Sequence, residues 1–237
     1  MATKLTGRAQ AFPEVLMTSS TIQEMDLGTV VESSGEEFIY VKAGAADLVP
    51  GKLQAAPAPV ANHQNVACAV TDIGATQVTV TLGGTAATEN QYKEGKIIIN
   101  AGTGVGYTYR IKYNPAASGG ATMVVTLEDA IVVALDATSK ACLQANPCNG
   151  VVINPTTQVD VPVGVAVYAI PTGQYGLLMK RGVVSCIADG IVSAGQEVCA
   201  SNGTAGAFEA FTGTQPIIGK TRIASVNGEY RPIEVLL

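Results

Sequence analysis

The sequence contains no tryptophan and is poor in both aromatic and charged residues. Its 237 residues include 4 Phe and 8 Tyr, and only 14% are Asp, Glu, Lys or Arg, against about 25% in a typical soluble domain. Hydrophobic residues make up 47% of the chain, so a sizeable core can form, but Val, Ile, Leu and Ala must fill it. A surface with so few charges is easily covered by another protein, because little charge has to be desolvated.

The charge and hydropathy of the chain also bear on which partners it can bind. The formal net charge is −5, and the lysines and arginines form no cluster that would contact a phosphate backbone. The N-terminus lacks the apolar core of a signal peptide, and no apolar run approaches the roughly 20 residues of a membrane-spanning helix. We therefore expect no nucleic-acid and no membrane partner, and synthesis in a host cytoplasm that keeps the cysteines reduced.

Candidate catalytic and metal-binding residues are few and isolated. His63 is the only histidine, and no nucleophile or carboxylate accompanies it in a catalytic pattern, so we predict a surface or linker position. Cys142 and Cys148 lack the second pair of ligands that a zinc site needs. Small buried hydrophobic side chains are the favoured interpretation of both cysteines, and a local disulfide is the alternative.

The other motif-like stretches are typical of turns. Gly102–Gly106 resembles a nucleotide-binding glycine loop, but a strand pattern follows it where such a loop requires a helix, so we predict a hairpin turn. Asp136, Asp160 and Asp189 lie among turn residues without the spacing of a calcium loop. These observations predict a protein that is not an enzyme and that has no cofactor and no metal.

Hydrophobic patterning predicts an all-β chain without a long helix. The stretch from 164 to 198 predicts four short strands, with a tight hairpin at Ala188–Gly190, and Asn227–Gly228 is the strongest hairpin signal in the chain. The expected strands are residues 28–32, 37–42, 52–54, 77–82, 96–100, 107–113, 122–127, 131–135, 165–168, 175–180, 183–187, 197–199 and 229–237.

A Pro/Ala-rich linker at Ala55–Ala61 marks a boundary between two β regions. We expect a discontinuous small β-barrel or sandwich domain formed by residues 28–60 and 155–237. Residues 61–154 then form an inserted second β domain. Residues 1–27 precede both as an extended N-terminal arm.

The arm carries scattered apolar residues that follow neither a strand nor a helix period. Such a segment is floppy in isolation, so we expect it to lie on another surface, either of its own domain or of a neighbour. Phe12, Leu16 and Met17 are the candidate partner-binding residues.

Several short motifs of the discontinuous domain resemble those of a known family. They are turns with their flanking strands, at Leu27–Val30, Phe38–Gly44, Leu48–Leu53, Val163–Ala166, Gly173–Gly176, Arg181–Val183, Ala194–Val198, Ile218–Lys220 and Gly228–Leu237. In these motifs the chain resembles the capsid cement, or head decoration, proteins of tailed bacteriophages, over residues 28–54 and 158–237. The inserted stretch lies outside the resemblance and departs from the compact pattern of the family.

The resemblance implies a structural protein of the virion. Proteins of this family bind the outer surface of the shell of major capsid protein where capsomers meet, often as trimers. Open strand edges invite pairing with other chains, and repetition over a closed shell strengthens weak single contacts. We therefore expect a place on the capsid surface, with the major capsid protein and further copies of this chain, as a homotrimer, as partners.

Two other functions remain open from the sequence. A tail, baseplate or fibre-attachment module of a phage has the same structural character. A carbohydrate-binding or hydrolytic β domain is less favoured, because sugar sites usually use exposed aromatic side chains and paired carboxylates, and this chain has no Trp.

Overall fold

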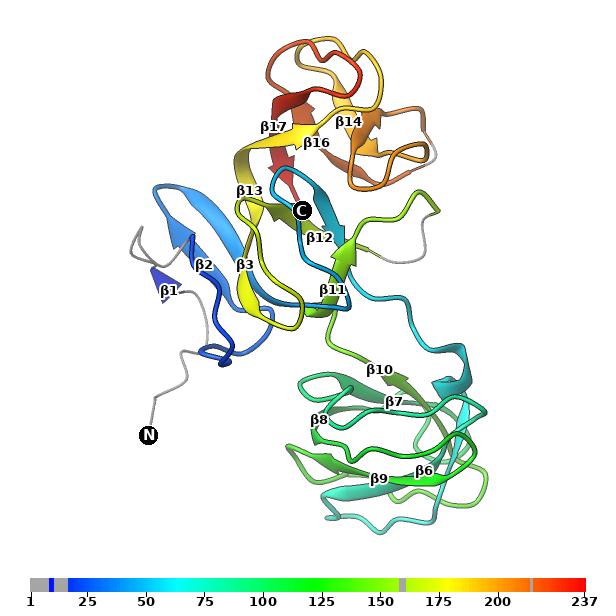
Figure 1. The fold of residues 1–237 in the computed structure, drawn as a ribbon. Helices are drawn as coiled ribbons and strands as arrows, with labels where there is room; N and C mark the ends of the chain where they lie inside the picture. Colours follow the sequence, from blue (N-terminus) through cyan, green and yellow to red (C-terminus); the bar gives the residue numbers. More distant parts are fainter. Residues whose placement is uncertain (1–8, 11–16, 158–160, 214) are drawn as a thin grey trace. The chain divides into compact units, whose positions relative to one another are not determined.

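The structure is a computed structural model that describes residues 9–10, 17–157, 161–213 and 215–237. The all-β prediction is confirmed, since the one helical element of these residues is a short 3₁₀ turn, η2 (Ala61–His63). The chain divides into two compact units, which we call unit 1 (Met1–Ala58 and Pro147–Leu237) and unit 2 (Pro59–Asn146). Figure 1 shows both as β structures joined by two crossings of the chain.

Unit 1 is organised around one long strand, β13. Its strands are β1 (Ala9–Gln10), β2 (Val30–Ser33), β3 (Glu36–Ala43), β4 (Leu53–Ala55), β11 (Asn149–Ile153), β12 (Pro162–Ala166), β13 (Tyr175–Ile187), β14 (Glu197–Ala200), β15 (Phe208–Ala210), β16 (Ile217–Thr221) and β17 (Tyr230–Leu236). β13 pairs with β3 and β12 along its first half and with β17 along its second half. The halves meet at Gly182, whose φ is +139°.

Two circuits of strand pairing share β13. The first runs from β3 through β11, β4 and β12 to β13 and returns to β3. The second runs from β13 through β17, β16 and β14 to β15, and a bridge between Phe208 and Ala188 leads back to the end of β13. One hydrophobic core serves both circuits, and Leu53, Leu178 and Ile233 are completely buried in it.

The described part of the N-terminal segment packs on unit 1 itself. Ser20 exchanges two backbone hydrogen bonds with Tyr175, and the Tyr168 hydroxyl donates to the Thr18 carbonyl at 2.7 Å. Met25 and Leu27 are buried in the core. Of the two surfaces expected for the arm, residues 18–27 therefore use that of their own unit.

Unit 2 is a closed barrel with its own core. Its strands are β5 (Val66–Cys68), β6 (Gln77–Thr81), β7 (Lys96–Ala101), β8 (Thr108–Tyr113), β9 (Thr122–Leu127) and β10 (Lys140–Gln144), joined in the order β10-β5-β6-β9-β8-β7 and back to β10. Alternate residues point inward, as in β6, where Val78 and Val80 are buried and their neighbours are not. This alternation is what a half-buried strand requires.

Unit 2 ends earlier along the chain than the expected residue 154. β11, which the sequence analysis assigned to the inserted domain, pairs in parallel with β3 and antiparallel with β4. The Asn154 N–H also donates to the Leu53 carbonyl at 3.0 Å. Backbone pairing therefore attaches residues 147–154 to unit 1. At the other boundary, unit 2 begins at Pro59 instead of residue 61.

Three local expectations are wrong. Residues 175–180 and 183–187 are one continuous strand, because Gly182 allows β13 to bend without ending. Ala188–Gly190 closes no hairpin, because the neighbour of β13 is β17 and β14 pairs with β15 and β16. Residues 131–135 are irregular, although Ile131 and Leu135 fill the core of unit 2.

Candidate functional site

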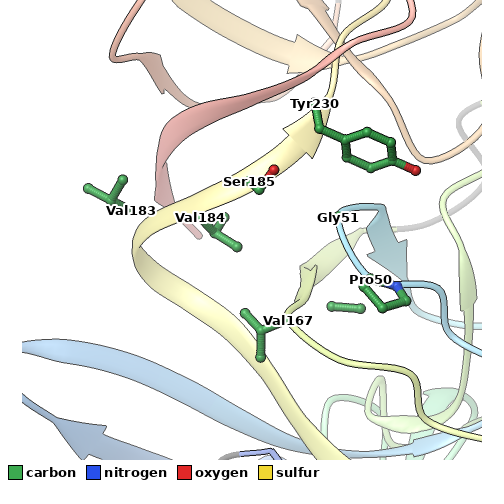
Figure 2. Close-up of a pocket in the computed structure, with 8 residues that line it drawn as sticks. Pro50, Gly51, Val167, Val183, Val184, Ser185 and Tyr230 are labelled. Carbon is green, nitrogen blue, oxygen red and sulfur yellow. The ribbon is translucent and has the colours of Figure 1, made fainter.

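A groove of about 450 Å³ lies beside β13 in unit 1. Figure 2 shows it between β13 and the turn that precedes β4. The groove is lined by Pro50, Gly51, Ala166, Val167, Val183, Val184, Ser185 and Tyr230. It therefore lies on the second half of β13, just beyond the bend at Gly182.

Gly51 holds one wall of the groove in place. Its N–H donates to the Ala166 carbonyl at 2.8 Å, and its carbonyl accepts from the Ile187 N–H at 2.9 Å. The ring of Tyr230 lies against it, since a Cβ on Gly51 would be 2.5 Å from Cε1 of that ring. Gly51 also has a φ of +69°, which favours glycine over any other residue. A glycine at this position therefore forms this wall without backbone strain or a clash with the ring.

The floor of the groove is a bare stretch of strand edge. In an antiparallel ladder, successive residues direct their N–H and C=O groups to opposite sides. The Ile187 N–H points away from β17, to Gly51, so the backbone groups of Ser185 and Val183 point the same way. The Ser185 carbonyl oxygen is 3.5 Å from the position that a Gly51 Cβ would take, which agrees with this direction.

Neighbouring segments cover the same edge of β13 on either side of this stretch. β3 pairs with it up to Arg181, opposite Glu37, and Gly51 occupies it at Ile187. Between these two points, no strand of the described residues pairs with Val183 or Ser185 on the groove side. The N–H and C=O groups of both residues are therefore available to an extended backbone.

The chemistry of the groove is that of a contact surface. None of its eight lining residues is charged, and none is a histidine or cysteine. Its side-chain polar groups are the hydroxyls of Ser185 and Tyr230, and the Tyr230 side chain is half exposed. Such a groove offers apolar contacts and backbone hydrogen bonds, and its lining holds no carboxylate, lysine, histidine or cysteine.

A smaller cavity of about 170 Å³ lies under the N-terminal segment. Tyr40 and Tyr175 line it and stack with ring centroids 5.9 Å apart. The Tyr40 hydroxyl accepts from the Glu24 N–H at 3.0 Å, and burial raises the pKa of Tyr40. Several hydrogen bonds of its lining fasten the segment to unit 1, including that of the Ser19 hydroxyl to Gln174 Oε1 at 2.8 Å, so we assign the cavity no separate role.

The predicted position of His63 is wrong. Its side chain is fully buried in unit 2, where Nδ1 shares a hydrogen bond with the Tyr92 hydroxyl and Nε2 contacts the Thr85 carbonyl at 2.8 Å. The barrel places the histidine next to the linker in sequence but beneath its own loops in space. With both ring nitrogens engaged, His63 is a structural residue of the barrel.

The other candidate positions are turns and buried thiols. Cys148 is buried in unit 1, Cys142 is half-buried in unit 2, and both are free thiols. Asp136 accepts hydrogen bonds from Thr103 and Thr138, which lower its pKa to about 2. Asp189 accepts from the Ser201 hydroxyl at 2.5 Å, and Asp160 lies outside the described residues.

The remaining sequence features are a glycine-rich turn, candidate metal ligands and apolar stretches. Gly102–Gly106 joins β7 to β8, as predicted, and all three of its glycines have positive φ. Across the residues that the structure describes, no three His, Cys, Asp or Glu side chains gather as metal ligands. Within the same ranges, no helix has the length and hydrophobicity to cross a membrane.

Of the three predicted partner-binding residues, the structure describes only Met17. Phe12 and Leu16 lie outside the described residues, and Met17 is 58% exposed. The groove on β13 was missed by sequence reasoning, because Pro50, Val183 and Tyr230 are far apart in the chain. The signals present in the sequence are the Pro50–Gly51 turn and a tyrosine shortly after Asn227–Gly228.

Comparisons with known proteins give no relative. Neither the scan against protein-family models, nor the search of curated proteins, nor the search of solved structures found a match.

Proposed function

We propose that this chain is a structural protein of a tailed-bacteriophage particle that decorates and stabilises the capsid. It binds the outer surface of the major capsid protein shell at capsomer junctions, as a homotrimer, and catalyses no reaction. The observation that carries the proposal is the groove of unit 1: an uncharged recess whose floor is an unpaired strand edge. Such an edge is a ready template for pairing with a strand of another polypeptide.

Two features of the chain support this proposal. The stretches that resemble cement proteins, residues 28–54 and 158–237, lie far apart in sequence but belong to the same compact unit with one core. The low charge of the chain also makes a large contact with other proteins inexpensive in desolvation. Many identical contacts on a closed shell then hold strongly even when each one is weak.

The test uses particles of the phage that encodes this chain. We expect gold-labelled antibody against the chain to mark the heads, and mass spectrometry to find it in a fixed ratio to the major capsid protein. Particles made without the chain should release their DNA at a lower temperature. Label confined to tails, or absence of the chain from purified particles, would overturn the proposal.

A further inference from the structure

The groove on β13 also indicates which face of the chain contacts the shell, an inference that rests on the proposed function. We propose that an extended, uncharged segment of the major capsid protein lies in the groove and adds to β13 as a strand at Val183–Ser185. The capsid protein supplies the backbone hydrogen bonds that this edge lacks. This is strand addition, in which main-chain bonds give affinity and the flanking side chains give selectivity.

The pattern of backbone groups along β13 favours an extended polypeptide as the occupant of the groove. Val183 and Ser185 each present an N–H and a C=O toward the groove, because Ile187, two and four residues further on, donates in that direction to Gly51. An extended backbone presents donors and acceptors at the matching spacing of two residues. A sugar or a small apolar molecule has no such array.

The apolar, uncharged walls of the groove favour an uncharged occupant. Pro50, Val167 and Val184 are apolar, and the lining contains no charged side chain. A bound strand therefore places uncharged, preferably apolar, residues in the groove, since a charge there would lose its hydration without gaining a partner.

The position of the bare stretch excludes a second copy of the same edge as the occupant. The bare stretch is recessed between β3, which ends its pairing at Arg181, and the Gly51 turn, which closes the edge at Ile187. Two recessed edges cannot approach each other closely enough to pair. The occupant has to be a segment that projects from its own protein, such as a loop or a terminal extension.

The test variants change either the backbone donor of β13 or the charge of the groove, and each has a matched control. Ser185→Pro removes the N–H that faces the groove, and this N–H makes no bond to β17; proline is tolerated at such edge positions. Ser185→Ala is the matched control, because it removes the hydroxyl and keeps the backbone donor. Val167→Glu puts a charge into the groove, and Ile191→Glu puts the same charge at an 81% exposed position that does not line it.

The experiment mixes each full-length variant with shells assembled without this chain and measures bound protein by sedimentation. We expect wild type, Ser185→Ala and Ile191→Glu to coat equally, and Ser185→Pro and Val167→Glu to need at least about tenfold more protein for half-coating, as the loss of a backbone hydrogen bond predicts. Circular dichroism confirms folding, and Val167→Glu decides the matter if Ser185→Pro does not fold. Amide exchange at 183–185 should slow on coated shells.

The outcomes separate the two proposals. If wild type does not coat shells, the proposed function fails. If wild type coats them and both groove variants coat equally well, or if exchange at 183–185 is unchanged on the shell, the groove is not the contact. If the groove variants alter only the self-association of the free chain, the occupant is a second copy, and the assignment to the capsid protein is wrong.

Discussion

At the scale of single residues, the contact between Gly51 and Tyr230 shapes the mouth of the groove. We predict that Gly51→Ala destabilises unit 1, because a Cβ there would lie 2.5 Å from Cε1 of Tyr230 and the residue has a φ of +69°. A non-glycine residue in the left-handed region costs about 1–2 kcal/mol, and overpacking adds about 1–3 kcal/mol. Urea unfolding of wild type and variant measures the loss.

The matched control is Gly35→Ala. Gly35 has a φ of +83°, and a Cβ built on it meets nothing within 4 Å, so this variant should show only the conformational loss. A larger destabilisation by Gly51→Ala than by Gly35→Ala isolates the contact with Tyr230. Equal losses would mean that the ring moves aside freely and does not define the groove.

The buried cysteines give unit 1 and unit 2 a sensitivity to alkaline pH. Burial raises the pKa of Cys68 to about 11 and those of Cys148 and Cys186 to about 12, from an ordinary value of 9.0. The folded state therefore holds these protons more tightly than the unfolded chain. The stabilisation is fully present below pH 9 and is lost as the pH rises from 9 toward 12.

We predict that the free energy of unfolding falls between pH 9 and 11, with a limiting slope of about 1.4 kcal/mol per pH unit for each such thiol. Chemical unfolding at a series of pH values measures this slope. In Cys186→Ala, which is a small change in size, the slope should be smaller than in wild type. An identical slope in the two proteins would contradict this origin of the pH dependence.

His63 shows how far single residues can be predicted from the sequence. A lone histidine beside a Pro/Ala linker indicated an exposed position, yet its partners Thr85 and Tyr92 are more than twenty residues away. The groove escaped prediction for the same reason, because its lining comes from four separate segments of the chain. Turn glycines were predictable because the requirement for positive φ is local, as at Gly102 and Gly228.

At the scale of secondary-structure elements, the bend in β13 determines how unit 1 is built. Gly182 has a φ of +139°, and a Cβ there would lie 2.9 Å from Sδ of Met179 and 3.0 Å from Cγ of Glu36. We predict that Gly182→Val destabilises unit 1 by about 2–4 kcal/mol, because strain and crowding act at the strand shared by both circuits. Differential scanning calorimetry of the variant measures the effect.

Gly190→Val is the comparison for this prediction. Gly190 has a φ of +93°, but a Cβ built on it meets nothing within 4 Å, and it lies just after β13 ends. Gly190→Val should therefore lose stability only through its strained backbone conformation, because no neighbouring atom clashes with the new side chain's Cβ. If both variants unfold at the same temperature, the bend is not a point where the fold of unit 1 is sensitive.

Strands were predictable wherever one face is buried and the other is exposed. β6 and β9 show that alternation in the residues themselves, and both were expected at nearly their observed bounds. β12 and β4 are buried along their whole length, so periodicity gives no signal for their bounds. The apolar run 131–135 was taken for a strand because burial of a loop produces the same composition as burial of a strand.

At the scale of the whole molecule, the chain is two independent hydrophobic cores connected at two crossings. Each core lies entirely within one unit, and every strand of the unit 2 barrel pairs within that barrel. The resemblance to cement proteins covers unit 1 and stops at unit 2. We therefore expect the proposed binding to the shell to depend on unit 1.

The last prediction follows from this division: residues 59–146 fold alone. The two ends of the segment are already joined near the barrel, since the Gln64 Nε2 donates to the Leu143 carbonyl at 3.0 Å and the Gln144 Nε2 donates to the Gln64 Oε1 at 2.9 Å. Excision therefore cuts no ladder of the barrel. We expect a β-rich circular dichroism spectrum and one cooperative thermal transition.

A shorter piece beginning at residue 74 is the control. It lacks β5, which closes the barrel between β10 and β6, so two strand edges and part of the core are exposed and the piece should not fold cooperatively. If residues 59–146 are also unfolded, the barrel depends on unit 1 for its stability. Because β13 and its groove lie wholly in unit 1, the opposite result would allow unit 2 to be removed while shell binding is measured on the remainder.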